Sequence, residues 1–324
     1  MFTHIILAMT LKLTCLFSIF FLSLNALAQD GKILRQEPYS FHDTTIHKLE
    51  KLLPDIHEIL KTVDFYSITY LSDGLKVNGY LSIPKKKTKY PAVIYNRGGN
   101  RELGALTDFQ IVRMLGTVAS WGYVCIGSQY RGNGGSEGRE EFGGKDINDV
   151  LNLIPCLANV QEADTSRIGM FGWSRGGLMT YLALSKTCNI KAAVIGSGLT
   201  DAFGIIKKRA DMETVFSELA PGYAQNKDSV LLARSPLYWP EKLCATTPLL
   251  LLSGSADWRV TPTEQLDMVR KLYDLKHPVR YTLFEGGDHS LMEHLDEVNH
   301  AVKVFLDAYV RDLQKWPSLE VHGN

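Results

Sequence analysis

Gly172-Trp173-Ser174-Arg175-Gly176-Gly177 is the stretch of this chain that decides its fold. It matches Gly-x-Ser-x-Gly, a pattern in which a serine lies on a strained turn between a strand and a helix. Such a turn needs small residues two places before and two places after the serine, and Gly172 and Gly176 meet that need. Residues 167–171 have the composition of a short buried strand, and residues 178–182 have the spacing of a helix face. A glycine-rich turn with an incidental serine is the alternative, which the rest of the chain has to exclude.

Length and composition are those of an ordinary globular protein. The chain has 324 residues, of which 45% are hydrophobic and 22% are charged. Lys and Arg together number 35, as do Asp and Glu, so the formal net charge is +0. No basic run stands out that would bind a phosphate backbone or anionic lipid. We therefore expect no nucleic-acid partner.

The first residues have the pattern of a signal peptide. An apolar run at 13–24 follows Lys12, and Ala26-Leu27-Ala28 closes it with the small-x-small pattern that signal peptidase cuts. We predict cleavage after Ala28 and export to a periplasm or to the medium, whether synthesis starts at Met1 or Met9. A retained membrane anchor is the alternative, because the apolar length alone does not exclude it. No other stretch is long and apolar enough to span a bilayer, so no membrane contact is expected after cleavage.

Four cysteines would remain after cleavage at Ala28. Cys125, Cys156, Cys188 and Cys244 are spaced too widely for a zinc site or a small disulfide scaffold. Free buried thiols are the simplest interpretation. A disulfide between Cys188 and Cys244 is the alternative, because both would lie in adjoining connections at the amino-terminal edge of the sheet, in an oxidising compartment.

Strand-like and helix-like segments alternate through most of the chain. Residues 29–64 predict an N-terminal helical extension with a leucine and isoleucine stripe interrupted by Pro54. Ser72-Asp73-Gly74 predicts the turn of an antiparallel hairpin between runs at 65–71 and 75–83. Further apolar runs are found at 91–95, 123–127, 167–171, 192–195, 248–252 and 279–284. This alternation predicts one α/β domain over 65–324, with a mostly parallel sheet, helices on both faces and a lid-like insertion at about 200–240.

Candidate partners for Ser174 follow two of the predicted strands. Ligands bind at the carboxyl ends of parallel strands, and this type of turn takes its partners in the order serine, acid, histidine. Asp257 follows the run at 248–252 and His289 follows the run at 279–284, in that order. We expect His289 to act as the general base for Ser174 and Asp257 to orient its ring.

Two neighbouring residues offer other interpretations. Asp288 is a rival acid, but it adjoins His289 and is better interpreted as a loop-turn residue. His294, with His289 and Glu293, lacks the order of a zinc-protease helix, so we expect no metal and no cofactor.

An oxyanion formed on a substrate carbonyl needs preorganised hydrogen-bond donors. We predict the backbone N–H of Arg175, at a helix N-terminus, and that of Gly99, in the glycine-rich loop after the strand at 91–95. Arg97 and Trp173 are candidate substrate contacts. The Arg97 guanidinium could receive an anionic substrate group, or it could pair with a carboxylate such as Glu102.

Taken together, residues 65–309 resemble the catalytic domain of the prolyl oligopeptidase family, serine peptidases with the α/β-hydrolase fold. Residues 172–177 resemble the nucleophile turn of that family, and residues 254–260 resemble its acid loop. The Arg-Gly loop at 130–135 and the segment at 144–150 complete the resemblance, with Arg131 and Asp149 interpreted as structural residues.

The resemblance implies an exported serine hydrolase that cleaves peptides through an acyl-enzyme without a cofactor. Large members carry a β-propeller, for which residues 29–64 are too few, and the His-Gly-Gly of many relatives is here Arg97-Gly98-Gly99. No preference for proline is therefore carried over. A hydrolase of carboxylic esters, such as acylated carbohydrate, is one alternative, and a non-catalytic ligand-binding protein on the same fold is another.

Overall fold

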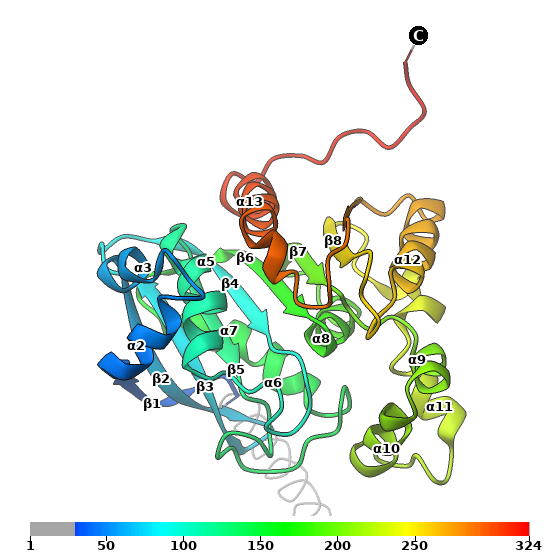
Figure 1. Ribbon diagram of the computed structural model, residues 1–324, viewed down its shortest axis with the longest axis horizontal. Coiled ribbons are helices and arrows are strands. Elements are labelled where there is room, and N and C mark those ends of the chain that lie inside the picture. Colours follow the sequence, from blue (N-terminus) through cyan, green and yellow to red (C-terminus); the bar gives the residue numbers. More distant parts are fainter. Residues whose placement is uncertain (1–29, 324) are drawn as a thin grey trace, which may run out of the picture.

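The computed structural model describes residues 30–323, and Figure 1 shows them as a twisted sheet between layers of helices. The predicted signal peptide at 1–28 lies outside the described residues. Within 30–323, the helices are all too short or too polar to cross a membrane.

A mixed sheet of nine strands forms the centre of the molecule, in the order β1-β2-β3-β5-β4-β6-β7-β8-β9. The strands are β1 (Ile33–Pro38), β2 (Val63–Ser72), β3 (Leu75–Pro84), β4 (Tyr90–Asn96), β5 (Val124–Ser128), β6 (Ala163–Trp173), β7 (Ile190–Gly196), β8 (Leu249–Gly254) and β9 (Val279–Phe284). β1, β2, β3 and β5 pair antiparallel in turn, and the remaining pairs from β5 to β9 are parallel. The predicted α/β-hydrolase architecture, mostly parallel and opened by an antiparallel hairpin, is confirmed.

The N-terminal extension differs from its prediction as a purely helical segment. Residues 33–38 form β1, which pairs antiparallel with β2 at the edge of the sheet. Two helices follow, α2 (Asp43–Leu49) and α3 (Ile56–Thr62), on either side of Pro54. Nearly all of β1 is exposed, so its sequence lacks the apolar alternation that would have indicated a strand.

Each face of the sheet carries its own hydrophobic core. One core lies under α2, α3, α5 (Thr117–Ser120) and α13 (Leu295–Leu306). The other lies under α6 (Ile147–Leu151), α7 (Leu153–Ala158), α8 (Arg175–Leu184) and α12 (Pro262–Asp274). α12 begins with proline at its first position, and Met268 and Leu272 face inward while Leu266 is exposed.

The helix after β4 contains an irregular central turn. It starts as α4 (Asp108–Gln110), continues as a π-helical segment, η1 (Ile111–Gly116), and ends as α5. π-Helical turns are rare and occur mostly within α-helices, often near functional sites. η1 brings residues 113 and 114 to the carboxyl edge of the sheet, where they line a cavity.

The segment between β7 and β8 is a helical insertion. It contains α9 (Ala202–Lys208), α10 (Ala210–Leu219), α11 (Lys227–Leu232) and two short 3-10 turns, η2 (Pro236–Tyr238) and η3 (Pro240–Lys242). Four of its residues, Leu199, Ile205, Arg209 and Met212, line the cavity. That the insertion acts as a lid stays a prediction.

The structure joins Cys188 and Cys244 in a disulfide, with Cα atoms 5.4 Å apart. Cys188 follows α8 and Cys244 precedes β8, so the bond lies at the amino-terminal edge of the sheet. The interpretation of all four cysteines as free buried thiols is therefore wrong for Cys188 and Cys244, and it holds for Cys125 and Cys156, which are free and buried.

Candidate active site

Ser174 lies on the strained turn that its glycines predicted. Its φ of 57° and ψ of −121° fall outside the regions that L-residues favour. A Cβ on Gly172 would lie 2.1 Å from the Gly176 carbonyl oxygen, and one on Gly176 would lie 1.9 Å from the Asn96 carbonyl oxygen. Larger side chains therefore cannot replace these glycines without moving the backbone that holds Ser174 at the mouth of the cavity.

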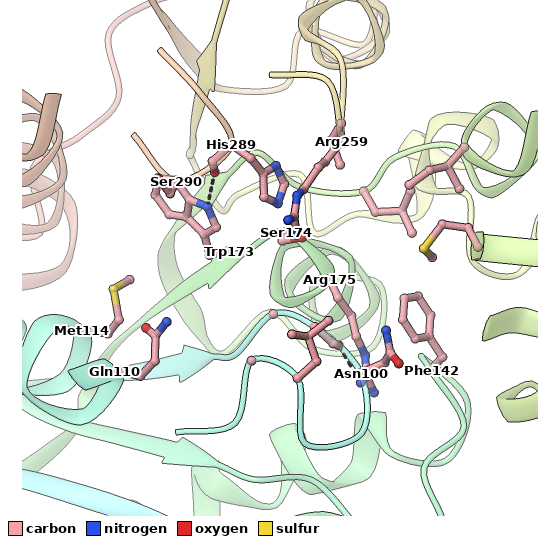
Figure 2. A pocket seen from close by; sticks show the side chains of 18 of the residues that line it. Asn100, Gln110, Met114, Phe142, Trp173, Ser174, Arg175, Arg259, His289 and Ser290 are labelled. Carbon is pink, nitrogen blue, oxygen red and sulfur yellow. Dashed lines mark hydrogen bonds between the residues drawn. The ribbon is translucent and has the colours of Figure 1, made fainter. Parts of the chain in front are cut away.

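The loops after β8 and β9 bring Asp257 and His289 together. His289 Nδ1 lies 2.8 Å from Asp257 Oδ2. The other carboxylate oxygen of Asp257 accepts the backbone N–H groups of Arg259 at 2.8 Å and Val260 at 3.1 Å. Asp257 is buried, whereas His289 lines the same cavity as Ser174. Figure 2 shows the His289 ring next to Ser174, so the three predicted residues meet at one site.

Asp288 accepts hydrogen bonds from the residues of its own turn and not from the His289 ring. Its Oδ1 accepts the Ser290 N–H and hydroxyl, both at 2.7 Å, and the Leu291 N–H at 3.0 Å. These bonds, led by the Ser290 hydroxyl, hold the pKa of the Asp288 carboxyl below its usual value. The loop-turn interpretation of Asp288 agrees with this geometry.

His294 is also held within its own loop. It lies in a 3-10 turn, η4 (Met292–His294), where Nε2 lies 3.0 Å from the Glu285 carbonyl oxygen and Nδ1 lies 3.2 Å from Glu297 Oε1. Among residues 30–323, three or more His, Cys, Asp or Glu side chains nowhere gather in a way that could hold a metal ion.

The two predicted oxyanion donors flank Ser174. Arg175 is the first residue of α8, so its N–H has no partner within the helix. Gly99 has a φ of 66°, and its N–H has no hydrogen-bond partner among the described residues. A Cβ on the neighbouring Gly98 would lie 3.2 Å from the Cβ of Ser174, so the loop passes directly against the nucleophile. Gly99 and Arg175 both line the cavity.

The prediction that Arg97 contacts substrate or pairs with a carboxylate is wrong. Arg97 is fully buried and does not line the cavity. Its guanidinium donates to three backbone carbonyls, those of Gln129 (3.0 and 2.9 Å), Gly98 (3.1 Å) and Arg101 (3.1 Å). Burial lowers the pKa of Arg97 to about 10. The side chain turns inward because the carbonyls of the glycine-rich loop need donors there.

Trp173 lies beside the histidine loop. Its indole N–H donates to the His289 carbonyl oxygen at 2.8 Å, as Figure 2 shows, and its ring forms part of the cavity wall. Trp173 therefore helps to position His289, and its contact with substrate stays a prediction.

Sequence reasoning missed Glu140, which ties the oxyanion loop to the nucleophile turn. Its carboxylate accepts the Arg101 N–H at 2.7 Å, the Asn133 side-chain amide at 3.0 Å and Nη1 of Arg175. Arg175 also donates to the Gly99 carbonyl oxygen at 3.0 Å and to Asp146 at 2.7 Å. All of these side chains are buried or nearly so. Glu140 lies in no motif, so only the fold reveals it.

Arg131 and Asp149 form a separate buried ion pair. Arg131 Nη2 lies 2.7 Å from Asp149 Oδ1, and neither residue lines the cavity. Burial raises the pKa of Asp149, against the opposing effect of Arg131. Their position agrees with the structural role predicted for them.

The cavity above Ser174 is lined by apolar, aromatic and polar side chains and has a volume of about 260 Å³. We call the apolar side chains of Phe142, Leu199, Ile205 and Met212 the apolar wall; Arg209, which lies between Ile205 and Met212 in sequence, also lines the cavity. The lining further includes Tyr95, Gln110, Arg113, Met114, Trp173 and Ser290. In Figure 2, Gln110, Met114 and Trp173 lie on one side of Ser174 and Phe142 on the other.

Comparisons with known proteins point to one family. A model of the prolyl oligopeptidase family, peptidase family S9, matches residues 109–315. The uncharacterized peptidase YtmA of Bacillus subtilis is 31% identical over 228 residues, which cover 70% of this chain and 86% of that protein. This chain spans only 30% to 34% of the length of three longer peptidase relatives.

Solved structures show the same fold. The acylaminoacyl peptidase of Pyrococcus horikoshii is 25% identical with a TM-score of 0.67, over 82% of this chain and 45% of that one. An acetyl xylan esterase from Paenibacillus sp. R4 has a TM-score of 0.62 over 88% of this chain and 92% of that one. At 19% identity, the esterase shows likeness of fold alone.

Proposed function

The chain belongs to the prolyl oligopeptidase family of serine peptidases, and we propose that it is an exported enzyme that cleaves peptides through an acyl-enzyme formed on Ser174. The observation that carries the proposal is the hydrogen bond between His289 and Asp257 beside a serine held on a strained turn. A histidine fixed in this way can take the proton of a serine hydroxyl, which is otherwise a weak nucleophile.

Each residue has a distinct part in the proposed reaction. Ser174 Oγ attacks the carbonyl carbon of the scissile bond while Nε2 of His289 takes its proton, and Asp257 stabilises the resulting imidazolium. The carbonyl oxygen becomes an oxyanion that accepts the N–H groups of Arg175 and Gly99. His289 then gives the proton to the departing amine, and water releases the acyl group by the same steps in reverse.

Active-site labelling tests the nucleophile. A fluorophosphonate probe should modify the wild-type protein at Ser174, as located by peptide mapping, and should not modify Ser174→Ala. Absence of labelling on folded protein would refute the proposed mechanism and favour the non-catalytic binding protein.

Matched substrates then test the bond that is cleaved. The enzyme should hydrolyse a peptide amide as well as the ester with the same acyl group. Cleavage of the ester alone would identify a carboxylic-ester hydrolase.

Export is supported by the signal-peptide pattern and by the disulfide, because disulfides form and persist in oxidising compartments. Cell fractionation should find the protein outside the cytoplasm, with a mature chain that begins at Gln29. Full-length protein in the cytoplasm would contradict export without affecting the peptidase proposal.

A further inference from the structure

The cavity carries positive charge that its own residues do not neutralise. Four arginines line it, and within the described part of the chain no aspartate or glutamate does. Two of the four have carboxylate partners: Arg175 pairs with Asp146 and Glu140, and Arg209 pairs with Asp211 at 2.6 Å. Arg113 and Arg259 form no ion pair with any carboxylate among residues 30–323. A substrate with a negative charge would therefore find two available guanidinium groups.

Arg113 is the more unusual of the two because it is largely withdrawn from water. In the described residues its side chain makes one hydrogen bond, from Nη2 to the Ser290 carbonyl oxygen at 3.0 Å. Its Nε is buried without a partner. Burial lowers the pKa of Arg113, while Tyr95 and Asp288 act in the opposite direction. Buried charges are normally paired, so a bound anion would complete this site.

The position of Arg113 places it on the leaving-group side of the scissile bond. A departing group must lie near His289, because that residue returns the proton to it. Arg113 donates to the carbonyl of Ser290, the residue after His289, and Trp173 donates to the carbonyl of His289 itself. Arg113, Gln110, Met114, Trp173 and Ser290 thus form a leaving-group wall.

The apolar wall and the volume of the cavity restrict further which substrates can bind. Phe142, Leu199, Ile205 and Met212 offer apolar contacts, with the ion-paired Arg209 among them, and suit an apolar side chain on the acyl side. The volume of about 260 Å³ lies just below the range of roughly 300–1,000 Å³ that is typical of small-molecule pockets. A short leaving group that ends in a charge fits this arrangement better than a long continuing peptide.

We propose that Arg113 binds the terminal carboxylate of a single-residue leaving group, so that the enzyme releases C-terminal amino acids after an apolar residue. This inference rests on the proposed serine peptidase function. In the reaction, the peptide C–N bond breaks, the amine of the departing residue takes the proton from His289, and water later provides the hydroxyl that frees the acyl group. The carboxylate of the departing residue keeps its charge throughout and stays on Arg113 until release.

Two peptides that differ only in the terminal charge test the inference. Acetyl-Phe-Ala carries a free carboxylate, and acetyl-Phe-Ala-amide does not. For the wild-type enzyme, kcat/KM should be about 10- to 100-fold higher for the acid, the range expected for a charge-assisted hydrogen bond in a partly buried site. High salt should reduce this ratio only slightly, because a buried contact is weakly screened.

Three variants assign the effect to a residue. Arg113→Gln should lower the acid-to-amide ratio to near one, and Arg113→Lys should keep part of the preference. Arg259→Gln tests whether the exposed Arg259, instead of Arg113, produces the preference for the acid. Arg270→Gln is the matched control, because Arg270 is exposed on α12 outside the cavity, and it should keep the wild-type ratio. Thermal melting and probe labelling of Ser174 check that each variant is folded.

The outcomes separate this inference from the proposed function. A wild-type ratio near one in an enzyme whose Ser174 is labelled would overturn the inference and leave the peptidase proposal intact. A high ratio that survives in Arg113→Gln but is lost in Arg259→Gln would also overturn it. If Arg113→Gln does not fold, the inference is tested by the acid-to-amide ratios of the wild type and of Arg113→Lys. It then requires a high ratio in the wild type and a reduced ratio in Arg113→Lys. Only the absence of Ser174 labelling would remove the proposed function itself.

Discussion

Replacing Glu140 with glutamine should weaken both the fold and the catalytic geometry. The Glu140 carboxylate holds Arg175 through one oxygen, and Arg101 and Asn133 through the other. Glutamine keeps the volume but puts an NH₂ donor opposite one of these donors. Asp146 still neutralises Arg175. The decrease in the free energy of unfolding should therefore be near the lower end of the range that is usual when a buried ion pair is broken. We expect Glu140→Gln to reduce the free energy of unfolding by about 3 kcal/mol.

The same substitution should also reduce turnover. The Arg101 N–H bond to Glu140 fixes the chain just after Gly99, and Arg175 binds the Gly99 carbonyl. Loss of one oxyanion donor costs roughly 100- to 1000-fold in kcat, and a shifted donor should cost less, about tenfold. Urea unfolding followed by tryptophan fluorescence measures the first effect, and steady-state hydrolysis of a fluorogenic peptide measures the second.

Glu137→Gln provides the control for Glu140→Gln within the same loop. The Glu137 side chain is 50% exposed and lies 3.9 Å from Lys76 Nζ, so its ion pair should contribute at most about 1 kcal/mol. If Glu140→Gln unfolds at the same urea concentration as Glu137→Gln and keeps the wild-type kcat, the buried network does not support the site and this reasoning is refuted.

Three further predictions concern the acid of the candidate triad, the disulfide, and the buried His277, whose Nε2 lies 2.9 Å from the Thr247 carbonyl oxygen. Asp257→Asn should lower kcat on the order of ten-thousand-fold, the figure known for the corresponding change in another serine protease, while Asp288→Asn should keep most activity; the reverse result would reassign the acid. Replacing Cys188 and Cys244 together by serine should destabilise the protein by about 4 kcal/mol, from the chain entropy of a loop with a sequence separation of 56, and unchanged urea unfolding would show that no disulfide forms. Burial lowers the pKa of His277 in the folded state, so the unfolded chain takes up the proton first, and stability should be complete above pH of about 6.5 and fall as the pH decreases below it. His277→Gln should flatten this decline in thermal melting between pH 5 and 7, and an identical slope would contradict the assignment.

The sequence predicted the sheet and the position of the candidate triad because both depend on local patterns. β8 is a continuous buried apolar run, β9 is a partly exposed strand at the edge of the sheet, and the loops after these two strands carry Asp257 and His289. Once the strand order is known, the carboxyl ends of these strands must meet the turn at Ser174. Chain order and strand ends therefore carried enough information to bring three distant residues together.

The directions of individual side chains could not be predicted in the same way. Arg97 adjoins the oxyanion loop in sequence but points into the protein, whereas Arg113 is distant in sequence and lines the cavity. The difference depends on which backbone carbonyls lack donors and on the π-helical turn η1, and neither feature has a local signature. β1 was missed for a related reason, since an exposed edge strand needs no apolar alternation.

The insertion between β7 and β8 places part of the substrate cavity and the candidate triad in different segments of the chain. Part of the apolar wall comes from one continuous segment, in which Ile205 and Met212 belong to α9 and α10, while the candidate triad lies outside that segment. Recombination that exchanges residues 202–242 between relatives would transplant Ile205, Arg209 and Met212 together in a single genetic event. Such modularity offers an evolutionary route to new substrate preferences, and a practical one for engineering, without disturbing the nucleophile.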